Sequence, residues 1–412
     1  MDNEISFISY SEMLKILDKH KNNHLLLGNG FNCSLGIKTR YSVIFQKMKL
    51  NNPNYEKIID SSFDLEEFIG KCKSKIIKDD NQYYDFMTTF FHNRIKEDFM
   101  KAVTEIVSKE VKNIFQEKNE SIFLLLKNFN NFFTLNYDPF LYQLLMSYKK
   151  NDSPEKEAMA FRNSLPFVKD LMENEDKELY KIISQAYRSG QLTLSISDNT
   201  ISTDDLNKLT KSQFTQIVKK YLKDKNFSKN RIIKVINKIW EENINPNKKV
   251  IENIDDGFAL FDNDLTYCHP ETQNLFFLHG AFHIYKKGKL IYKITQTSDK
   301  ALYEKIEEVI ENKDENILCI FSDKNKLDEI KNEQYYLNCY NKLEKLDGDL
   351  VIIGCAFSSN DEHIFLQINK SKVSNIYVTC FENEQKAFRL KLRKLFPNKT
   401  IILVDIKTIT YN

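Results

Sequence analysis

The chain has no long hydrophobic segment. No apolar run in its 412 residues reaches the roughly 18 residues that a membrane-spanning helix needs. The N-terminus also lacks the basic start and short apolar core of a secretory signal peptide. These absences argue against an integral membrane protein and predict a soluble, cytoplasmic one.

The chain has almost no excess of charge of either sign. Its 60 lysine and arginine residues nearly balance 58 aspartate and glutamate residues, for a formal net charge of +2. A protein that coats nucleic acid or a membrane surface carries a strong positive excess. The balance therefore predicts no membrane partner and no direct nucleic-acid partner, while a local basic patch stays open.

Cysteine is sparse and forms no paired motif. The seven cysteines are odd in number and scattered, and no Cys-x-x-Cys pair occurs. Such pairs build structural zinc sites, so we expect no metal. Several cysteines lie in apolar runs, which is typical of buried free thiols in a reducing compartment. They are Cys33, Cys72, Cys268, Cys319, Cys339, Cys355 and Cys380.

Glycine is also scarce, with 10 in the chain, yet two of them share one short motif. Residues 24–32 read HLLLGNGFN, an apolar run that breaks at Gly28 and Gly30. A buried strand that ends in a glycine turn often presents main-chain N–H groups to a phosphate. The third glycine of the usual dinucleotide motif is missing, because Cys33 stands there. A strand-to-helix turn without a ligand is the alternative.

Two later segments end in polar side chains. Residues 132–139, FFTLNYDP, are an apolar run that ends in Asn136 and Asp138, and residues 275–280, LFFLHG, end in His279. Ligands of open parallel sheets bind beyond the carboxyl ends of the strands, so we expect these side chains around one crevice with the glycine turn. The alternatives are a pair of turn-capping side chains and a core histidine bonded to a main-chain carbonyl.

Strand-like runs alternate with helical segments in the rest of the chain, and two of them flank a Lys286-Lys287-Gly288 hairpin turn. This alternation predicts an α/β fold: a Rossmann-like parallel sheet with helices on both faces and a large helical insertion. The expected parts are residues 1–138, the insertion at 139–270, and residues 271–412. The C-terminal runs are residues 317–321, 350–353, 375–380 and 401–404.

The insertion is strongly basic between residues 208 and 249. A solvated lysine-rich helix face and a docking surface for an acidic partner or nucleic acid are both open interpretations. Tyr221, Phe227 and Trp240 occur at helical spacing and are expected in a core. The basic residues are Lys219, Lys220, Lys223, Lys225, Lys229, Arg231, Lys234 and Lys238.

Three other features have plain structural interpretations. Residues 63–68, FDLEEF, put acids on one face of a helix and aromatics on the other, which is typical of a helix with one solvated face. His283 lies in the predicted hairpin and is expected to be structural. Asp361 and His363 are expected to begin a helix, with Asn360 or Asp361 as its cap, and contact with a ligand is the alternative.

In this order, the motifs resemble those of the sirtuin-like NAD-binding family. That family carries a Gly-x-Gly turn, a Thr-x-Asn-x-Asp strand end, a His-Gly and a later Gly-x-Ser strand end; here these correspond to residues 28–30, 134–138, 279–280 and 350–358. The resemblance implies that residues 1–138 and 271–412 are two parts of one NAD-binding domain. The residues it implies for binding NAD, as substrate, are Gly28, Asn29, Gly30, Phe31, Asn32, Thr134, Gly354 and Ser358.

The resemblance also implies catalytic roles for three residues. Asn136 would hold the ribose or the attacking water, and Asp138 would bind the carboxamide of nicotinamide. His279 would act as general base toward a ribose hydroxyl or the water, a role that the near-neutral pKa of imidazole suits.

Deacylases of this family carry a zinc module built from two Cys-x-x-Cys pairs, which this chain lacks. It is more similar to the zinc-less bacterial branch, which implies an NAD+ hydrolase that depletes NAD in anti-phage defence. Such effectors imply a homo-oligomer or a partner such as a HerA-type ATPase. An NAD-dependent ADP-ribosyltransferase or deacylase, or a non-catalytic module that senses NAD or ADP-ribose, are the alternatives.

Overall fold

The structure is a computed structural model, and it divides into two compact units. The first comprises Met1–Leu141, Asp255–Lys293 and Ile306–Asn412, and the second comprises Tyr142–Ile254 and Ile294–Lys305. Residues 255–270, which the sequence analysis places in the insertion, thus belong to the first unit. The structure describes residues 6–20, 22–57, 82–148, 174–188, 192, 194–196, 199–201, 211–225, 227–239, 251, 253–261, 264–295, 301–312, 315–321 and 326–409. The predicted helix face at 63–68, Cys72 and Trp240 lie outside these residues.

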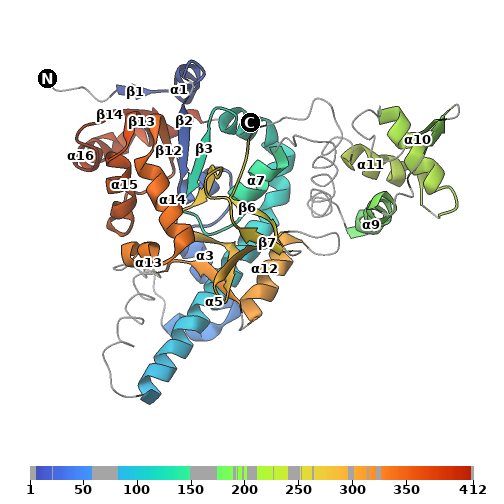
Figure 1. Cartoon of the computed structure of the whole chain (residues 1–412), viewed down its shortest axis with the longest axis horizontal. Helices are drawn as coiled ribbons and strands as arrows, with labels where there is room; N and C mark the ends of the chain where they lie inside the picture. Colours follow the sequence, from blue (N-terminus) through green and yellow to red (C-terminus); the bar gives the residue numbers. More distant parts are fainter. Residues whose placement is uncertain are drawn as a thin grey trace. The chain divides into compact units, whose positions relative to one another are not determined.

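The first unit is built on a seven-stranded sheet in which every pair of neighbours is parallel, in the order β1-β14-β13-β12-β2-β3-β8 (Figure 1). Its central strands β2 and β12 are apolar and fully buried over residues 25–27 and 350–353, as expected of a parallel sheet covered on both faces. This confirms the predicted α/β, Rossmann-like fold. The strands are β1 (Ser6–Ile8), β2 (Asn23–Leu27), β3 (Asn131–Thr134), β8 (Leu275–Phe277), β12 (Asp347–Ile353), β13 (Lys372–Cys380) and β14 (Thr400–Asp405).

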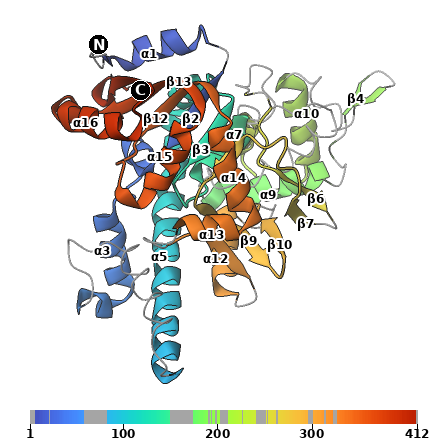
Figure 2. The same cartoon turned by 60° about the vertical axis from the view of Figure 1, so that its left-hand side comes forward.

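The helices of this unit lie on both faces of the sheet. Along the chain, β12, β13 and β14 proceed outward in one direction and β2, β3 and β8 in the other. Right-handed crossovers therefore put the two sets of connecting helices on opposite faces. The first set is α14 (Gln334–Glu344), α15 (Glu362–Asn369) and α16 (Gln385–Leu395), which lie together in Figures 1 and 2. The connection from β2 to β3 contains α2 (Asn29–Ser34), α3 (Tyr41–Asn51), α5 (Gln82–Glu117) and α6 (Asn119–Leu126).

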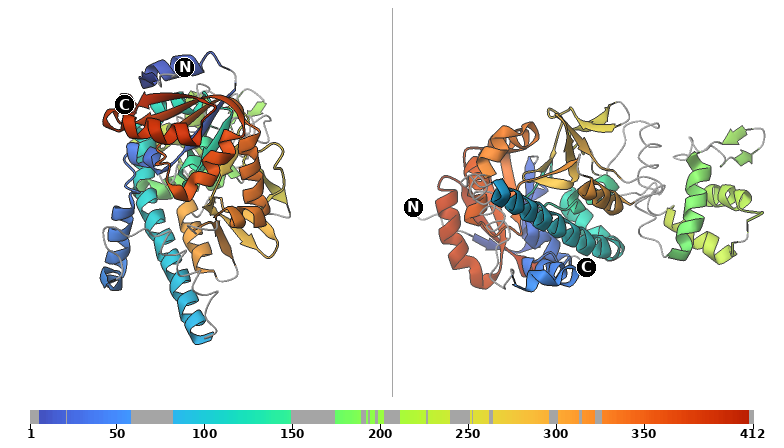
Figure 3. Two further views of the ribbon diagram at one scale, coloured as in Figure 1. Left: turned by 90° about the vertical axis from the view of Figure 1, so that its left-hand side faces the viewer. Right: turned by 90° about the horizontal axis from the view of Figure 1, so that it is seen from below.

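Helix α5 is the longest element, with 36 residues, and α3 lies beside it (Figures 2 and 3). The remaining helices of the first unit are short: α1 (Tyr10–Leu17) and α13 (Lys326–Asn332), with 3-10 turns at Pro53–Lys57, Ser359–Asp361, Glu382–Glu384 and Ile406–Thr408. Two helices, α7 (Phe140–Tyr148) and α12 (Leu302–Glu311), have residues in both units. No helix within the described residues is long and apolar enough to cross a lipid bilayer.

A second sheet of the first unit is antiparallel, in the order β11-β9-β10-β7-β6. The predicted hairpin at Gly288 is confirmed as β9 and β10. The prediction that the run 317–321 continues the parallel sheet is wrong, because its strand β11 pairs antiparallel with β9. Gly280 makes this possible: its φ is +78°, and a Cβ there would lie 1.8 Å from the carbonyl oxygen of Leu318 in β11. The strands are β6 (Phe258–Phe261), β7 (Asp264–Tyr267), β9 (Gly280–Lys287), β10 (Leu290–Lys293) and β11 (Asn316–Cys319).

The second unit has its own small core. The helices α9 (Asn174–Arg188), α10 (Lys211–Tyr221) and α11 (Lys229–Ile239) pack around buried aliphatic and aromatic side chains, beside the short strands β4 (Leu194–Ile196) and β5 (Asn199–Ile201). Tyr221 and Phe227 pack against this core, as the helical spacing predicts. Part of the basic run is used internally, since Arg231 and Lys234 lie 3.2 and 3.1 Å from the buried carboxylate of Asp176.

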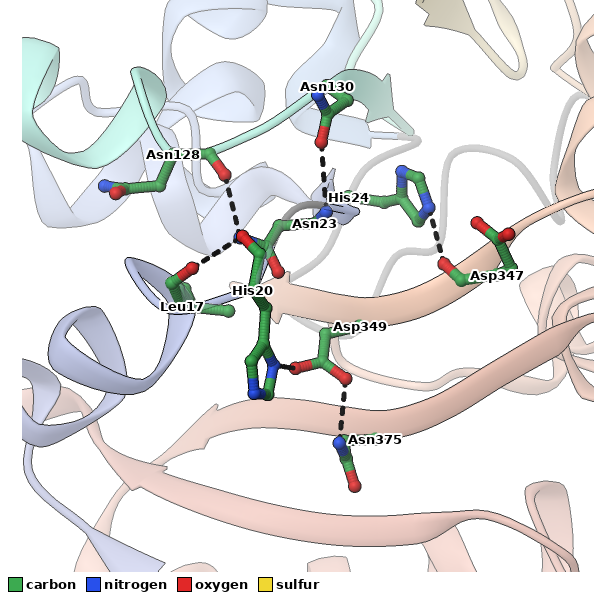
Figure 4. Close-up of polar contacts among 9 residues, drawn as sticks. All are labelled: Leu17, His20, Asn23, His24, Asn128, Asn130, Asp347, Asp349 and Asn375. Atoms are coloured by element: carbon green, nitrogen blue, oxygen red, sulfur yellow. Dashed lines mark hydrogen bonds and ion pairs between the residues drawn. The ribbon is translucent and has the colours of Figure 1, made fainter.

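At the amino end of β2, a network of polar side chains ties the central strands together (Figure 4). The buried amide of Asn23 donates hydrogen bonds to the main-chain carbonyls of Leu17 and Asn128, at 2.9 and 3.1 Å. Next to it, His24 Nε2 lies 2.7 Å from the carbonyl oxygen of Asp347 in β12. The network holds the start of β2 in register, and thereby fixes where its carboxyl end lies.

Asn23→Ala should therefore destabilise the protein by about 1–3 kcal/mol, because it removes the hydrogen bonds that the amide donates to the carbonyls of Leu17, His20 and Asn128. Urea unfolding measured with intrinsic fluorescence gives the difference. Asn22→Ala is the matched control, since the amide of Asn22 is exposed and makes one bond of 3.2 Å to Asp347. Equal stability of the two variants would show that the network does not support β2.

Candidate functional site

The carboxyl ends of four strands of the parallel sheet border one cavity of about 270 Å³ in the first unit. In the sheet β2 and β12 are neighbours, and the chain leaves them in opposite directions, so they form the topological switch point. Ligands of doubly wound sheets bind at this point. The cavity lies there, between the residues that follow β2, β3, β8 and β12.

The turn after β2 is closed by contacts between glycine backbones. A Cβ on Gly28 would lie 2.6 Å from the carbonyl oxygen of Gly354, and a Cβ on Gly30 would lie 2.6 Å from the Cα of Gly354. The N–H of Gly30 donates to the carbonyl of Gly354 at 2.9 Å. These glycines therefore let the β2 and β12 ends approach each other, which accounts for them without a phosphate.

Beside this turn, three polar side chains form a continuous chain of hydrogen bonds. Asn136 Nδ2 donates to Asn32 Oδ1 at 3.2 Å, and Asn32 Nδ2 donates to Asp138 Oδ2 at 2.8 Å. The other oxygen of Asp138 accepts the N–H of Phe140 at 3.0 Å, which is the turn-capping contact that the alternative interpretation predicts. Asp138 therefore caps its turn and also borders the cavity.

Burial raises the pKa of Asp138 to about 6, although the hydrogen bonds from Phe140 and Asn32 lower it. Ionisation of Asp138 therefore costs stability, and this cost increases as the pH rises from about 4 to about 6. At neutral pH the side chain is mostly a carboxylate, which accepts hydrogen bonds only.

His279 is buried beside the cavity, with 2 % of its surface exposed. Burial, with a smaller contribution from Lys326, holds its pKa well below the usual value. The ring is therefore neutral at pH 7 and able to accept a proton. Its Nε2 atom has no hydrogen-bond partner among the described residues. This nitrogen does not make the main-chain bond that the core-histidine interpretation predicts.

Two charged residues near His279 were missed as site residues. Asp361 Oδ1 lies 3.7 Å from His279 Nε2 and 3.1 Å from Nζ of Lys326, a lysine with 3 % of its side chain exposed. Asp361 precedes α15, as the capping prediction requires, but its side chain makes no capping bond and borders the cavity. Only the short Ser358-Asn360-Asp361 spacing after β12 could have indicated it, and no sequence signal indicated Lys326.

Part of the cavity lining is apolar. It is formed by side chains of α3 and α5 and by the residue after β3: Tyr41, Ile44, Phe99, Val103 and Leu135. Tyr41, with 40 % of its surface exposed, is the least buried of them, and its ring lies against that of Phe45. The lining thus offers both an apolar surface, which suits a flat apolar ring, and hydrogen-bonding groups.

The structure brings seven of the predicted site residues to the cavity, and these are Gly28, Asn29, Asn136, Asp138, His279, Gly354 and Ser358. The other four, Gly30, Phe31, Asn32 and Thr134, lie outside its lining. Asn32 and Thr134 are 1 % exposed and instead support the lining residues. Thr134 Oγ1 accepts the main-chain N–H of Asn136 at 3.0 Å.

The remaining histidine and cysteine predictions concern structure. His283 is buried in β9, where its ring meets that of Phe277, and it does not border the cavity. Within the described ranges, no group of three or more histidine, cysteine or acidic side chains is placed to hold a metal ion. The described cysteines are free thiols: Cys33, Cys268, Cys319, Cys339, Cys355 and Cys380.

Comparison with known proteins gives one family match. Residues 237–396 match a family described as "Domain of unknown function (DUF4917)". The match covers less than half of the chain; it includes His279, Gly354 and Asp361, and does not include Gly28 or Asp138. No curated protein matches the chain.

Lys326→Met should destabilise the protein by about 3–5 kcal/mol. The carboxylate of Asp361 is largely buried, and the substitution removes the ammonium group that pairs with it. The double variant Lys326→Met, Asp361→Leu should recover most of that loss. The measurement is denaturant unfolding. Lys109→Met removes an exposed ion pair with Glu105 and should change stability by less than about 0.5 kcal/mol. A small effect of Lys326→Met would mean that the pair is solvated.

Proposed function

We propose that this chain is an NAD+ hydrolase, which uses water to cleave the bond between nicotinamide and ribose and gives nicotinamide and ADP-ribose. One observation carries the proposal: Asn136, Asp138 and His279 border the same cavity as the glycine turn, at the switch point of a Rossmann-like sheet. The order of these motifs along the chain is that of the sirtuin-like family, which supports the assignment of NAD.

The size and the mixed lining of the cavity suit one end of NAD. Small-molecule sites commonly measure roughly 300–1,000 Å³, and this cavity of about 270 Å³ is just below that range. It would enclose the nicotinamide and its ribose and leave the rest of the dinucleotide outside. The flat nicotinamide ring would lie on the apolar surface of Ile44 and Phe99, with its carboxamide toward Asp138.

Each polar residue would have one task in the reaction. Asp138 would accept a hydrogen bond from the carboxamide NH2, and Asn136 would hold a ribose hydroxyl or the attacking water. The water oxygen forms a bond to the anomeric carbon as the glycosidic bond breaks. The electron pair of the broken bond stays on the pyridinium nitrogen, so nicotinamide leaves as a neutral molecule. His279, neutral at pH 7, would take the proton that the water loses.

The same resemblance extends the proposal to a biological role. A cell cannot tolerate an enzyme that freely consumes NAD, so an NAD-depleting effector in anti-phage defence must be inactive until triggered. Self-assembly into an oligomer, or a HerA-type ATPase partner, would supply that control.

The test of the proposal is to incubate the purified protein with NAD and to follow products by chromatography. Equal amounts of nicotinamide and ADP-ribose over many turnovers support hydrolysis. ADP-ribosylated protein would identify a transferase, and acyl-ADP-ribose formed from an acylated peptide would identify a deacylase. Binding of NAD without turnover, in the presence of candidate partners, would identify a sensing module.

His279→Ala and Asn136→Ala should each lower NAD cleavage about a hundredfold or more, because each removes a group positioned at the reacting atoms. Initial rates of nicotinamide release, with circular dichroism to check folding, provide the measurement. His269→Ala is the control, since this histidine is exposed, pairs with Glu271 and is remote from the cavity lining. A folded His279→Ala protein with normal turnover removes His279 from the reaction.

Nicotinic acid adenine dinucleotide should be cleaved about 10⁴-fold less efficiently than NAD. Its carboxylate has no donor for Asp138, and it places a like charge beside a buried carboxylate. The comparison of kcat/KM for the two dinucleotides at pH 8 measures this. Similar values would mean that Asp138 does not contact the carboxamide.

A further inference from the structure

Asn32 lies directly behind the cavity and contacts two of the residues to which the proposed function gives catalytic roles. It is 1 % exposed, does not border the cavity, and uses both ends of its amide in hydrogen bonds, to Asn136 and to Asp138. We propose that Asn32 is a positioning residue that fixes the amide of Asn136 with its oxygen toward the cavity. This inference rests on the proposed function for its catalytic meaning, and its structural content is independent of it.

The argument starts at Asp138. A carboxylate accepts hydrogen bonds and cannot donate them, so Asn32 must turn its NH2 group toward Asp138. The oxygen of the same amide then faces Asn136 and must be met by a donor, which is Nδ2 of Asn136. The carbonyl oxygen of Gly28, 3.4 Å from that Nδ2 atom, requires the same orientation. The carboxylate of Asp138 at one end of this series of hydrogen bonds, and the carbonyl of Gly28 at the other, thus fix the orientation of both amide groups.

This orientation determines which atom of the Asn136 amide is available to a ligand. Its NH2 group is occupied by Asn32 and Gly28, whereas no donor among the described residues reaches its oxygen. Asn136 borders the cavity, so the oxygen is the part left for a bound molecule. This position then accepts a ligand that donates a hydrogen bond, such as a hydroxyl group or a water, and disfavours a phosphate or carboxylate oxygen.

The same residue acts on Asp138. The hydrogen bond from Asn32 to Oδ2 lowers the pKa of Asp138 against the effect of burial, which leaves the pKa at about 6. The other titratable groups that border the cavity are Tyr41, Tyr137, His279, Cys355 and Asp361. Loss of the Asn32 bond alone should therefore raise the pKa of Asp138 by about 1 to 2 pH units, the contribution of one charge-assisted hydrogen bond.

Two substitutions separate positioning from packing. Asn32→Leu keeps the approximate volume and removes both hydrogen bonds. Asn32→Asp keeps the shape and the acceptor for Asn136, but sets a second carboxyl against Asp138. Two adjacent carboxyls share one proton, and that proton restores a donor toward Asp138. Asn32→Asp should therefore lose activity at pH 8 and regain part of it as the pH falls below the upper pKa of the pair.

The matched control is Asn23→Leu. Asn23 is also a buried asparagine whose amide donates hydrogen bonds, but it lies at the amino end of β2 and donates to the main-chain carbonyls of three residues. Asn23→Leu should lower stability and leave the pH profile of NAD cleavage and the titration of Asp138 unchanged. Asn32→Leu should lower kcat about a hundredfold and move the acidic limb of the profile upward by 1 to 2 pH units.

The experiment measures two quantities on the full chain. Carboxyl carbon chemical shifts of 13C-labelled aspartate give the pKa of Asp138, assigned with Asp138→Asn, without any substrate. Initial rates of nicotinamide release between pH 5 and 9 give the activity profile. An upward shift of the Asp138 titration in Asn32→Leu, with partial recovery of Asn32→Asp at low pH, supports the positioning role.

Unchanged titration of Asp138 in both Asn32 variants overturns it, as does an Asn32→Asp profile that matches the unsubstituted protein. If Asn32→Leu does not fold, the isosteric Asn32→Asp carries the test. If the unsubstituted protein does not cleave NAD, the proposed function fails, and the titration of Asp138 still decides whether Asn32 orients the chain of hydrogen bonds.

Discussion

The contact between the ends of β2 and β12 is the constraint on which the rest of the site depends. Gly28 and Gly30 meet Gly354 at distances that leave no room for a side chain on any of the three. A larger residue would separate the two strand ends and open the floor of the cavity. The glycines are therefore needed by the fold itself, and any phosphate that binds there would use a turn already formed for another reason.

Around this contact, the molecule separates two kinds of polar group. On the β3 side the groups are neutral amides that end at one carboxylate, and their orientation follows from that carboxylate. On the β8 and β12 side, a neutral imidazole lies beside a buried ion pair of Asp361 and Lys326. The first group orients a ligand through its amides, and the second holds a neutral imidazole that can accept a proton. A reaction that needs both orientation and a base finds them around one small space.

Much of the fold could be predicted from the sequence because it depends on local patterns. The apolar runs before Gly28, Asn136 and His279 give the strands, and their polar ends give the edge where the cavity forms. The apolar pattern of a strand does not show which other strand it pairs with. The run at 317–321 was therefore assigned to the parallel sheet, whereas it pairs with the antiparallel one. The three-residue edge strand β1 is too short to show periodicity. Lys326 could not be predicted as a site residue, because its burial follows from tertiary structure. Asn32 was predicted to contact the ligand, because a sequence motif does not show which side chains line a cavity and which lie behind its wall.

The pairing of β2 with β12 also determines when, during synthesis of the chain, the site can form. Leu25 pairs with Val351, so the two strands that form the cavity floor are separated by more than 300 residues of chain. At about 5–20 residues per second, a ribosome needs roughly 15–65 seconds to make the intervening segment. Until β12 has been made, the nascent chain lacks one of the two strand ends that form the cavity floor. The site therefore forms only late in the synthesis of the chain, by virtue of strand order alone.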